Sequence, residues 1–309
     1  MRIPIASLVL FLLAVPATVF AGQKTKPIDN PSRIGRREIA KGQPDFYSRE
    51  EAIEMGRKMA RNFDELATIY SDPETQTYME RLTDRIVRHS DVKIPVEVKV
   101  VLSNQVDAFA LPGGRLYVTT GLILRTRTEA ELAGVVAHEV AHIAARDATR
   151  QMTRQKIMNW ISVPLMLFGG PAYVIGESLA AGGPLAMLMF NRTAERRADN
   201  LGLQYLYESG YDPLGFVNFF ERARKLEKEP HSEIAKAFSS HPLTRDRVRA
   251  AEREIERNLP PRAQYVVTTS AYRHVRSRLA QYLRDQMPLV PATPKKPVLH
   301  KHTKKKHSR

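Results

Sequence analysis

The stretch VVAHEVAHIAARD, residues 135–147, places two histidines four residues apart in an apolar run, with a glutamate directly after the first. Upstream, Thr128-Glu129-Ala130-Glu131 has the pattern of a capping box, in which side chains satisfy the first free N–H groups of a helix. Apolar residues then recur at helical spacing. The sequence therefore predicts one helix over AELAGVVAHEVAHIAARDATRQM (130–152), with both histidines on it.

The spacing of the histidines suits a metal ion. On a helix, residues four apart share one face, with Cβ atoms about 5–6 Å apart. His138 and His142 can therefore direct two imidazoles at one zinc ion, each roughly 2.0–2.1 Å away. Glu139 is turned to the side, where it can reach a water molecule beside the metal. This HExxH pattern predicts a zinc site with a general base next to it.

A catalytic zinc site needs a third protein ligand and an open position. FNRTAERRADNLGLQYL (190–206) lies on another predicted helix, where Glu195 and Asp199 are four residues apart on one face. Glu195 would complete a His2Glu ligand set for one zinc ion per chain. Asp199, one turn further on, would fix the tautomer of a ligand histidine. We favour His138 as its partner, although the sequence leaves both rings open.

The alternative for both segments is an amphipathic helix with a solvated polar face. A single HExxH match also arises by chance. Here the surroundings VVAHEVAHIAA predict burial, and a buried cluster of these residues without a metal would carry a large desolvation cost. The two segments together favour the metal site.

The composition bounds the class of protein. The chain has 309 residues, enough for one large domain or two small ones, and 43% are hydrophobic, which excludes a disordered chain. It has no cysteine, so thiol ligands and nucleophiles are excluded. MRIPIASLVLFLLAVPATVFAGQ has a basic start, an apolar core and small residues before Ala21, which predicts a signal peptide at 1–21 and export to a bacterial periplasm. The alternative is an uncleaved membrane anchor.

About half of the net charge of +15 lies at the end of the chain. KKPVLHKHTKKKHSR (295–309) carries seven Lys and Arg residues and no acid. Residues 288–309 are expected to be a disordered basic tail that contacts anionic surfaces by charge alone, or that is simply solvated. We find no nucleic-acid fold signature and expect no specific nucleic-acid partner.

Capping and periodicity place the remaining elements. Residues 22–45 are polar and contain prolines, which indicates a linker. Ser48 and Glu51 form a capping box, Pro73 and Pro184 suit first helical turns, and Gly210 suits the position after a helix. Helices are expected at 49–69, 73–90, 184–209, 213–229, 243–258 and 269–286. Strands are expected at 96–103 and in DAFALPGGRLYVTTGLI (107–123), on either side of a Gly-Gly turn. The predicted fold class is α+β, mainly helical, with a small β-sheet.

At this point the sequence resembles the HtpX- and BepA-like zinc endopeptidases, relatives of the CAAX prenyl endopeptidase. The resemblance covers residues 46–258 and implies a zincin-like metallopeptidase domain with an HExxH active-site helix. It rests on motifs in the same order as in the family: SREEAIEMG, DPETQTYMERL, DAFALPGGRLYVTTGLI, ELAGVVAHEVAHIAARD, NRTAERRADNLGLQYL, GYDP and SSHPLTRDRV (239–248).

The resemblance implies roles for individual residues. The zinc ligands would be His138, His142 and Glu195, and Glu139 would be the catalytic base. The family's His-Pro motif falls on His241-Pro242, which implies that His241 lies close to the zinc and can occupy its open position, so that the enzyme is latent. Arg247, six residues later, would contact a substrate carbonyl or oxyanion.

Two features depart from the family. Many members have Asn-Ala-Phe before the Pro-Gly-Gly turn, whereas this chain has Asp107-Ala108-Phe109. An ionised acid cannot donate the hydrogen bonds of an amide, which puts a substrate contact there in doubt. BepA-like members also carry a C-terminal helical-repeat domain. Here 259–287 provides only a helical extension, TTSAYRHVRSRLAQYLRDQ.

The apolar region 157–190 separates the predicted ligands. Residues 157–176 are long enough to span a bilayer, although proline and glycine interrupt them. A single crossing would leave the histidines and Glu195 on opposite sides of the membrane, so we reject a spanning segment. We expect a flap over the site that can touch a membrane surface, or, equally, a buried helical hairpin.

These patterns together predict a zinc-dependent endopeptidase. The substrate would lie extended along the sheet edge near 107–119, contacting Gly113, Gly114 and Leu116, which favours unfolded or misassembled chains as substrates. Quality control of envelope proteins is the function we expect. The alternative is a chaperone-like assembly factor for outer-membrane proteins with latent protease activity. An integral-membrane prenyl-protein protease is disfavoured because the sequence lacks multiple spans.

Overall fold

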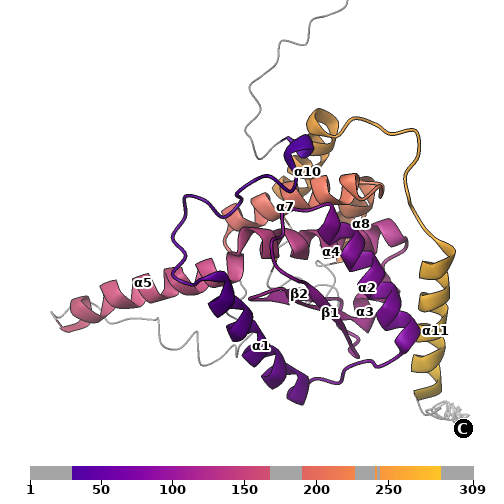
Figure 1. Cartoon of the computed structure of the whole chain (residues 1–309). Coiled ribbons are helices and arrows are strands. Elements are labelled where there is room, and N and C mark those ends of the chain that lie inside the picture. Colours follow the sequence, from indigo (N-terminus) through magenta and orange to yellow (C-terminus); the bar gives the residue numbers. More distant parts are fainter. Residues whose placement is uncertain (1–29, 168–189, 227–240, 242–243, 287–309) are drawn as a thin grey trace, which may run out of the picture.

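The helix that carries the histidine pair lies at the centre of the fold (Figure 1). The computed structural model describes residues 30–167, 190–226, 241 and 244–286. The predicted signal peptide, the basic tail, Pro184, Pro242 and residues 168–189 of the predicted flap lie outside the described residues. The predicted class is correct, because the described part is mainly helical with one three-stranded sheet.

The central helix α4 (Glu129–Ala145) packs against α7, α8, α2 and β2. The Thr128 side chain caps it by accepting a hydrogen bond from the Glu131 N–H. The second half of the predicted capping box is wrong, since the Glu131 carboxylate accepts from the N–H of Arg127 instead. Glu131 also pairs with Arg222 at 2.6 Å, which ties the start of α4 to α8 (Leu214–Leu226).

The predicted single helix over 130–152 is also wrong, because it breaks at Arg146. This residue has left-handed backbone angles (φ 55°, ψ 37°), which an L-residue with a long side chain rarely adopts. Its guanidinium lies 2.9 Å from the Asp45 carboxylate, a contact that helps to offset the strain. The chain continues as α5 (Asp147–Leu167), which leads away from the body in Figure 1. No helix of the described residues is both long and apolar enough to cross a membrane.

Two capped helices precede the sheet as predicted. α1 (Arg49–Leu66) begins with the expected Ser48–Glu51 capping box. It ends before Ile69, because Ile69 pairs with Val101 as an isolated bridge. α2 (Pro73–Arg88) has proline in its first turn, with the Asp72 side chain accepting from the N–H of Thr75.

The sheet has the strand order β1-β3-β2, with β1 (Glu97–Val101) parallel and β2 (Ala108–Leu111) antiparallel to β3 (Arg115–Thr119). Gly113 and Gly114 connect β2 to β3 with positive φ of 71° and 85°, which explains the Gly-Gly pair. The second strand of the hairpin ends earlier than predicted. The Thr119 side chain caps a short helix, α3 (Thr120–Arg125), which takes the place of the strand's expected continuation.

The later helices agree with the prediction except at one boundary. α7 (Arg192–Glu208) begins with Asn191 as its cap, and Phe190 and Asn191 are not helical, so a continuous helix from 184 is wrong. Gly210 ends α7 in a left-handed conformation, as predicted. The remaining helices are α8, α10 (Arg245–Asn258) and α11 (Ser270–Gln286).

The sheet separates two apolar clusters because its side chains alternate between its faces. Leu116 and Val118 of β3 point into the larger cluster with α2, α4, α7 and α11. Tyr117 points the other way, toward α1, where Phe63 meets Phe109 edge-on at 5.2 Å between ring centroids. This second cluster also receives Phe190, and it therefore reaches the start of α7.

Part of the stretch predicted as a linker is packed onto the domain. It includes a short 3-10 helix, η2 (Pro31–Arg33), and Arg37 is only 5% exposed. The Arg37 guanidinium donates to the Asp91 carboxylate at 2.9 and 2.5 Å and to the Gln204 side chain at 2.6 Å. Asp91 also accepts from the Tyr205 hydroxyl at 2.8 Å. The described part of 22–45 is therefore held by a buried ion pair.

We predict that Asp91→Ala destabilises the protein by about 3–5 kcal/mol, because it leaves the buried Arg37 charge without its carboxylate. Urea unfolding followed by circular dichroism measures this loss. Asp84→Ala, at an exposed position of α2, is the control and should change stability by no more than about 0.5 kcal/mol. Equal effects of the two substitutions would show that the Arg37–Asp91 pair contributes nothing specific.

Candidate active site

Four buried side chains from separate parts of the chain meet beside α4. They are His138 and His142 on α4, Glu195 on α7, and His241 just before α10, and one ligand atom of each lies within 4.8 Å of the others. Each of the four is 2% exposed. Every residue of α4 except Ala144 is buried, so a solvated amphipathic helix is ruled out for the HExxH segment.

The spacing of the ligand atoms fits a tetrahedral metal ion. The Nε2 atoms of His138 and His142 are 3.2 Å apart, and each lies 3.5 Å from a Glu195 carboxylate oxygen. Ligands at 2.0–2.1 Å from a tetrahedral zinc ion are roughly 3.3 Å from one another. The three side chains therefore need little rearrangement to hold such an ion.

Carboxylates orient both imidazoles. Asp147 Oδ2 lies 2.8 Å from Nδ1 of His142, and Asp199 Oδ1 lies 3.2 Å from Nδ1 of His138, the ring that we favoured as its partner. With the proton on each Nδ1, the two Nε2 lone pairs face each other across 3.2 Å. That arrangement is repulsive unless a proton or a metal ion lies between the two nitrogens, so the pair is suited to bind a cation.

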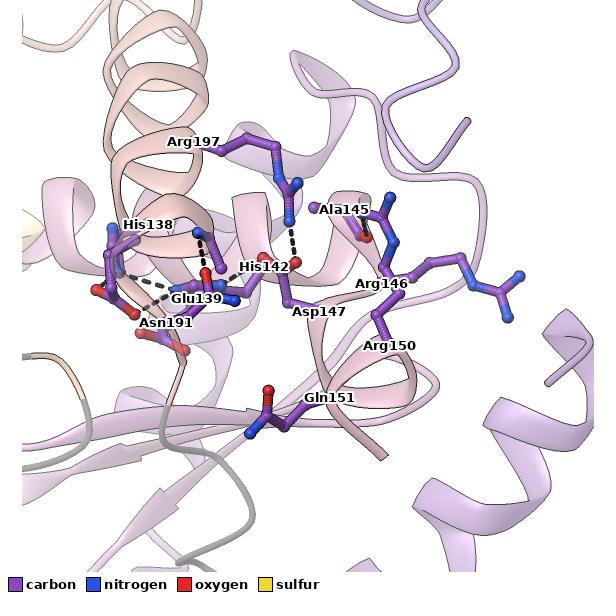
Figure 2. A network of polar contacts seen from close by, with 12 residues as sticks. His138, Glu139, His142, Ala145, Arg146, Asp147, Arg150, Gln151, Asn191 and Arg197 are labelled. Atoms are coloured by element: carbon purple, nitrogen blue, oxygen red, sulfur yellow. Dashed lines mark hydrogen bonds and ion pairs between the residues drawn. The ribbon is translucent and has the colours of Figure 1, made fainter. Parts of the chain in front are cut away.

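Asp147 was missed in the sequence, where 130–152 was taken as one continuous helix. The break at Arg146 turns Asp147 back toward His142 (Figure 2). Asp147 is fully buried, and Arg197 on α7 forms an ion pair with its other oxygen. The signal was an acid five residues after the second histidine, but only the backbone turn shows that it can reach the ring.

A close approach of α7 to α4 brings Glu195 and Asp199 to the histidines. A Cβ atom on Gly202 would lie 3.1 Å from the Cα of His138, tighter than nearly all real contacts. Glycine at this position therefore lets the two helices pack closely. Asn191 caps α7 by accepting from two N–H groups and so sets Glu195 in its first turn.

Arg247 lies behind the ligands and binds their carboxylates. Its guanidinium donates to both oxygens of Asp199 at 2.8 and 2.7 Å, and Nη1 lies 2.9 Å from Glu195 Oε2. Nη1 also donates to the His241 carbonyl at 3.2 Å. This cation compensates two buried acids. A contact between Arg247 and a substrate carbonyl stays a prediction.

The carboxylates make the site favourable for positive charge. Burial lowers the pKa of His142, but Asp147 and Glu195 outweigh it and raise the value to about 10. The same balance, with Asp199 and Glu195 as the acids, raises the pKa of His138 above its usual value. Burial raises the pKa of Glu195, but His241 and the two α4 histidines lower it far more. Groups that stabilise a proton so strongly also suit a divalent cation.

His241 lies next to the ligand set, at the place that the resemblance implies. Its Nδ1 is 2.9 Å from Glu195 Oε1 and 3.4 Å from Nε2 of His138. Its Nε2 is 3.5 Å from Glu139 Oε1. Composition alone gives no reason to single out this residue, and the chain fold is what brings it to the metal-ligating atoms.

Glu139 and Asp107 form an acidic pair beside the ligands. Glu139 is 2% exposed, and its Oε2 has no hydrogen-bond partner among the described residues. Burial, followed by the charge of Glu139, raises the pKa of Asp107 to about 8. A protonated Asp107 can donate one hydrogen bond, as the amide of the family's asparagine can.

Gly113, Gly114 and Leu116, which we expected to contact substrate at a sheet edge, do not lie on a free edge of the described sheet. Leu116 is in the middle strand, fully buried and paired with both Val98 and Ala110, so substrate pairing at Leu116 is wrong. Gly113 and Gly114 form a turn that packs closely on α1 and on Pro95. β2 is an edge strand of the sheet, paired with β3 on one side, and it contacts α4.

Two residues of β2 direct backbone groups away from β3. Thr119 donates to the Asp107 carbonyl, which makes this pair a hydrogen-bonded one. Because such pairs alternate in an antiparallel ladder, Ala108 and Ala110 have their N–H and C=O groups on the opposite side. These groups are not used in the pairing with β3, although both residues are buried, at 3% and 6% exposed.

The fold and this site define a metallopeptidase of the zincin-like class: two histidines of an HExxH helix and a glutamate from a second helix, with the glutamate of the HExxH motif beside them. Comparison with known proteins gives the particular family. The chain belongs to peptidase family M48, whose profile matches residues 73–255.

Named relatives agree with this assignment. The beta-barrel assembly-enhancing protease of Yersinia pestis is 28% identical over 224 residues, which cover 68% of this chain and 45% of that protein. Metalloprotease LoiP of Escherichia coli is 28% identical over 191 residues, covering 60% and 73%. Mitochondrial metalloendopeptidase OMA1 of Schizosaccharomyces pombe is 27% identical over 217 residues, covering 65% and 61%. The chain therefore spans less than half the length of the first of these relatives.

We predict that Asp147→Asn weakens zinc binding about 10- to 100-fold, because the amide no longer holds the His142 ring in the tautomer that leaves Nε2 free. Competition with a chromophoric chelator measures the affinity. Asp84→Asn, at an exposed site, should bind zinc like the unmodified protein. Unchanged affinity in Asp147→Asn would mean that His142 is oriented by other contacts.

A second prediction concerns Asp107. Its pKa of about 8 in the folded protein, against 3.8 as the ordinary value, means that the folded state binds this proton more tightly. The free energy of unfolding should therefore fall as pH rises from about 4 to about 8, by on the order of a few kcal/mol. Asp107→Asn should remove this part of the fall and should be the more stable protein at pH 8.

Urea unfolding at several pH values, with EDTA present to keep both proteins free of metal, measures this difference. The control is Asp84→Asn, whose stability should follow that of the unmodified protein at every pH. Parallel curves for Asp107→Asn and the unmodified protein would contradict the prediction.

Proposed function

We propose that the protein is a zinc-dependent endopeptidase that hydrolyses unfolded or misassembled envelope proteins. The observation that carries this proposal is the buried set of His138, His142 and Glu195, spaced for one tetrahedral ion, with Glu139 next to it. A His2Glu donor set is one of the known ligand combinations of catalytic zinc.

The residues divide the chemistry between them. Bound zinc supplies Lewis acidity toward the scissile carbonyl and toward the attacking water. Glu139 accepts a proton from that water and later delivers it to the leaving amine. Arg247 and Asp199 hold Glu195 and His138 in place, and Asp147 holds His142.

The geometry of the sheet supports extended chains as substrates. A peptide that pairs with the outward backbone groups of Ala108 and Ala110 is recognised through its own backbone, not through a folded surface. Only a segment without secondary structure of its own offers its N–H and C=O groups in this way. This mode favours unfolded or misassembled proteins.

The proposed location is the periplasm. It rests on the signal-peptide pattern at 1–21 and on the envelope role expressed in the name of the Yersinia relative, a beta-barrel assembly-enhancing protease. Residues 157–190 and the basic tail would allow peripheral contact with a membrane surface. That this protein acts on the same substrates as the full-length relative is part of the proposal.

The position of His241 supports a second candidate, a chaperone-like assembly factor with latent protease activity. Its ring lies among the ligand-forming atoms, where it can take the fourth position on a metal ion. Activity then requires that His241 withdraw so that water and substrate can enter. In this second case the protein holds its clients and cleaves them rarely.

We predict that Glu139→Gln abolishes cleavage of a disordered test protein such as casein while one zinc ion per chain remains bound. The substitution keeps the shape of the side chain and removes only its ability to accept a proton. Gel-based cleavage assays and metal analysis of the purified proteins measure both properties. Asp84→Asn serves as the active control.

His241→Ala distinguishes the two candidates. If the unmodified protein binds zinc and does not cleave, but His241→Ala cleaves, the latent state is supported. If neither cleaves while both hold zinc, the endopeptidase proposal fails and the binding role gains support.

A further inference from the structure

A pocket borders the metal site on the side of His142. It lies between the end of β2, the C-terminal half of α4, the first turns of α1 and α5, residues 37–40 and Phe190. Its cavity volume is about 60 Å³, within a wider hollow of about 710 Å³ that includes open solvent. Its apolar wall includes Ile39, Ala52, Leu111, Ile143, Ala148 and Phe190. No residue of this wall has a role in the chemistry proposed above.

Three of the charged groups that line the pocket, Arg37, Asp91 and Arg146, are paired within the protein, and Glu38, Arg49 and Lys93 also line it. Arg37 is bound by Asp91, and Arg146 lies 2.9 Å from Asp45. Asp45 also accepts from the Thr149 hydroxyl at 2.8 Å. Because the paired groups satisfy one another, the pocket offers a ligand mainly apolar surface. This combination, an apolar wall with few convergent polar groups, is typical of a site for a side chain or small ligand.

The pocket meets the metal site at His142. The Phe190 ring stacks on His142 with 4.2 Å between ring centroids and 22° between planes. Phe190 also belongs to the apolar cluster that contains Phe109 and Leu111 of β2, against which Ala148 packs. Phe190 therefore lines the pocket and at the same time contacts His142 and packs with residues of the edge strand β2.

The edge strand connects the pocket to the reacting centre. At one end of β2, burial and the charge of Glu139 raise the pKa of the neighbouring Asp107. At the other end, Ala110 and Leu111 line the pocket. Three residues of extended chain span roughly 10 Å. A substrate strand paired with β2 would thus place one of its side chains at the pocket, a few residues from the bond that is cut.

We propose that this pocket is a specificity subsite for a large apolar side chain of the substrate, such as Leu, Met or Phe, about two to four residues from the scissile bond. The proposal rests on the endopeptidase function. Folded proteins bury most such side chains, whereas unfolded chains expose them. The subsite therefore adds a selection for unfolded chains to the one made by backbone pairing.

Binding tests the pocket independently of catalysis. The Glu139→Gln protein, loaded with zinc, is titrated with fluorescent ten-residue peptides that contain a single Phe, Leu or Ala in an otherwise Ser-, Gly- and Thr-rich sequence. Anisotropy should show about tenfold or tighter binding of the Phe and Leu peptides than of the Ala peptide.

Two pocket variants in the same background remove this difference. Ala148→Phe fills the pocket and should bring all peptides to the affinity of the Ala peptide. Ala271→Phe, the same substitution at an exposed site of α11, should leave the preference intact. Ile39→Asp places a charge on the wall and should reverse the preference in favour of a peptide with Lys. Equal binding of the Phe and Ala peptides to the parent protein overturns the proposal.

Cleavage separates the subsite from the proposed function. The active protein digests a denatured protein, and mass spectrometry reads the sequence around every cut. Large apolar residues should be enriched at one fixed position, and Ala148→Phe should lose that enrichment. Cutting without any such position leaves the endopeptidase function intact and overturns the subsite. No cutting, with apolar-dependent binding that Ala148→Phe removes, supports the subsite and contradicts the endopeptidase function.

Discussion

Two imidazole nitrogens held 3.2 Å apart inside the protein are the constraint on which the rest of the structure depends. Their lone pairs repel unless a proton or a metal ion joins them, and a buried carboxylate lies 2.8 Å or 3.2 Å from the other nitrogen of each ring. Those carboxylates are themselves costly to bury, and Arg247 and Arg197 compensate them. The site is thus a set of alternating charges, in which removal of one member leaves its neighbours unbalanced.

The backbone provides this arrangement at two special positions. The left-handed Arg146 ends α4 directly after its histidines and returns Asp147 to the second ring. Gly202 lets α7 lie against α4, so that acids from a distant part of the chain reach both rings. Both features belong to the packing of elements, and neither touches the metal-ligating atoms. The precision of the site therefore depends on residues that take no part in the chemistry.

The sheet has a corresponding role for the substrate. Its middle strand is fully paired, and in the described part of the chain β2 is the edge strand that packs against α4. The apolar pocket lies at the far end of that edge, next to His142. The proposed backbone pairing and the proposed apolar subsite are two separate requirements, and a chain that has lost its fold would meet both. In this way the architecture supports a protease that acts on misassembled proteins.

The sequence by itself predicted the helical segments, the HExxH helix and the family, and it singled out His138, His142 and Glu195, which the structure brings together. These features follow from local rules: capping, periodicity and the four-residue spacing that puts two side chains on one face. Only the tertiary structure decided the break at Arg146, the role of Asp147, the position of Arg247 behind the ligands and the identity of the edge strand. Each depends on contacts between segments far apart in the chain or on one backbone angle, and local patterns carry no information about either.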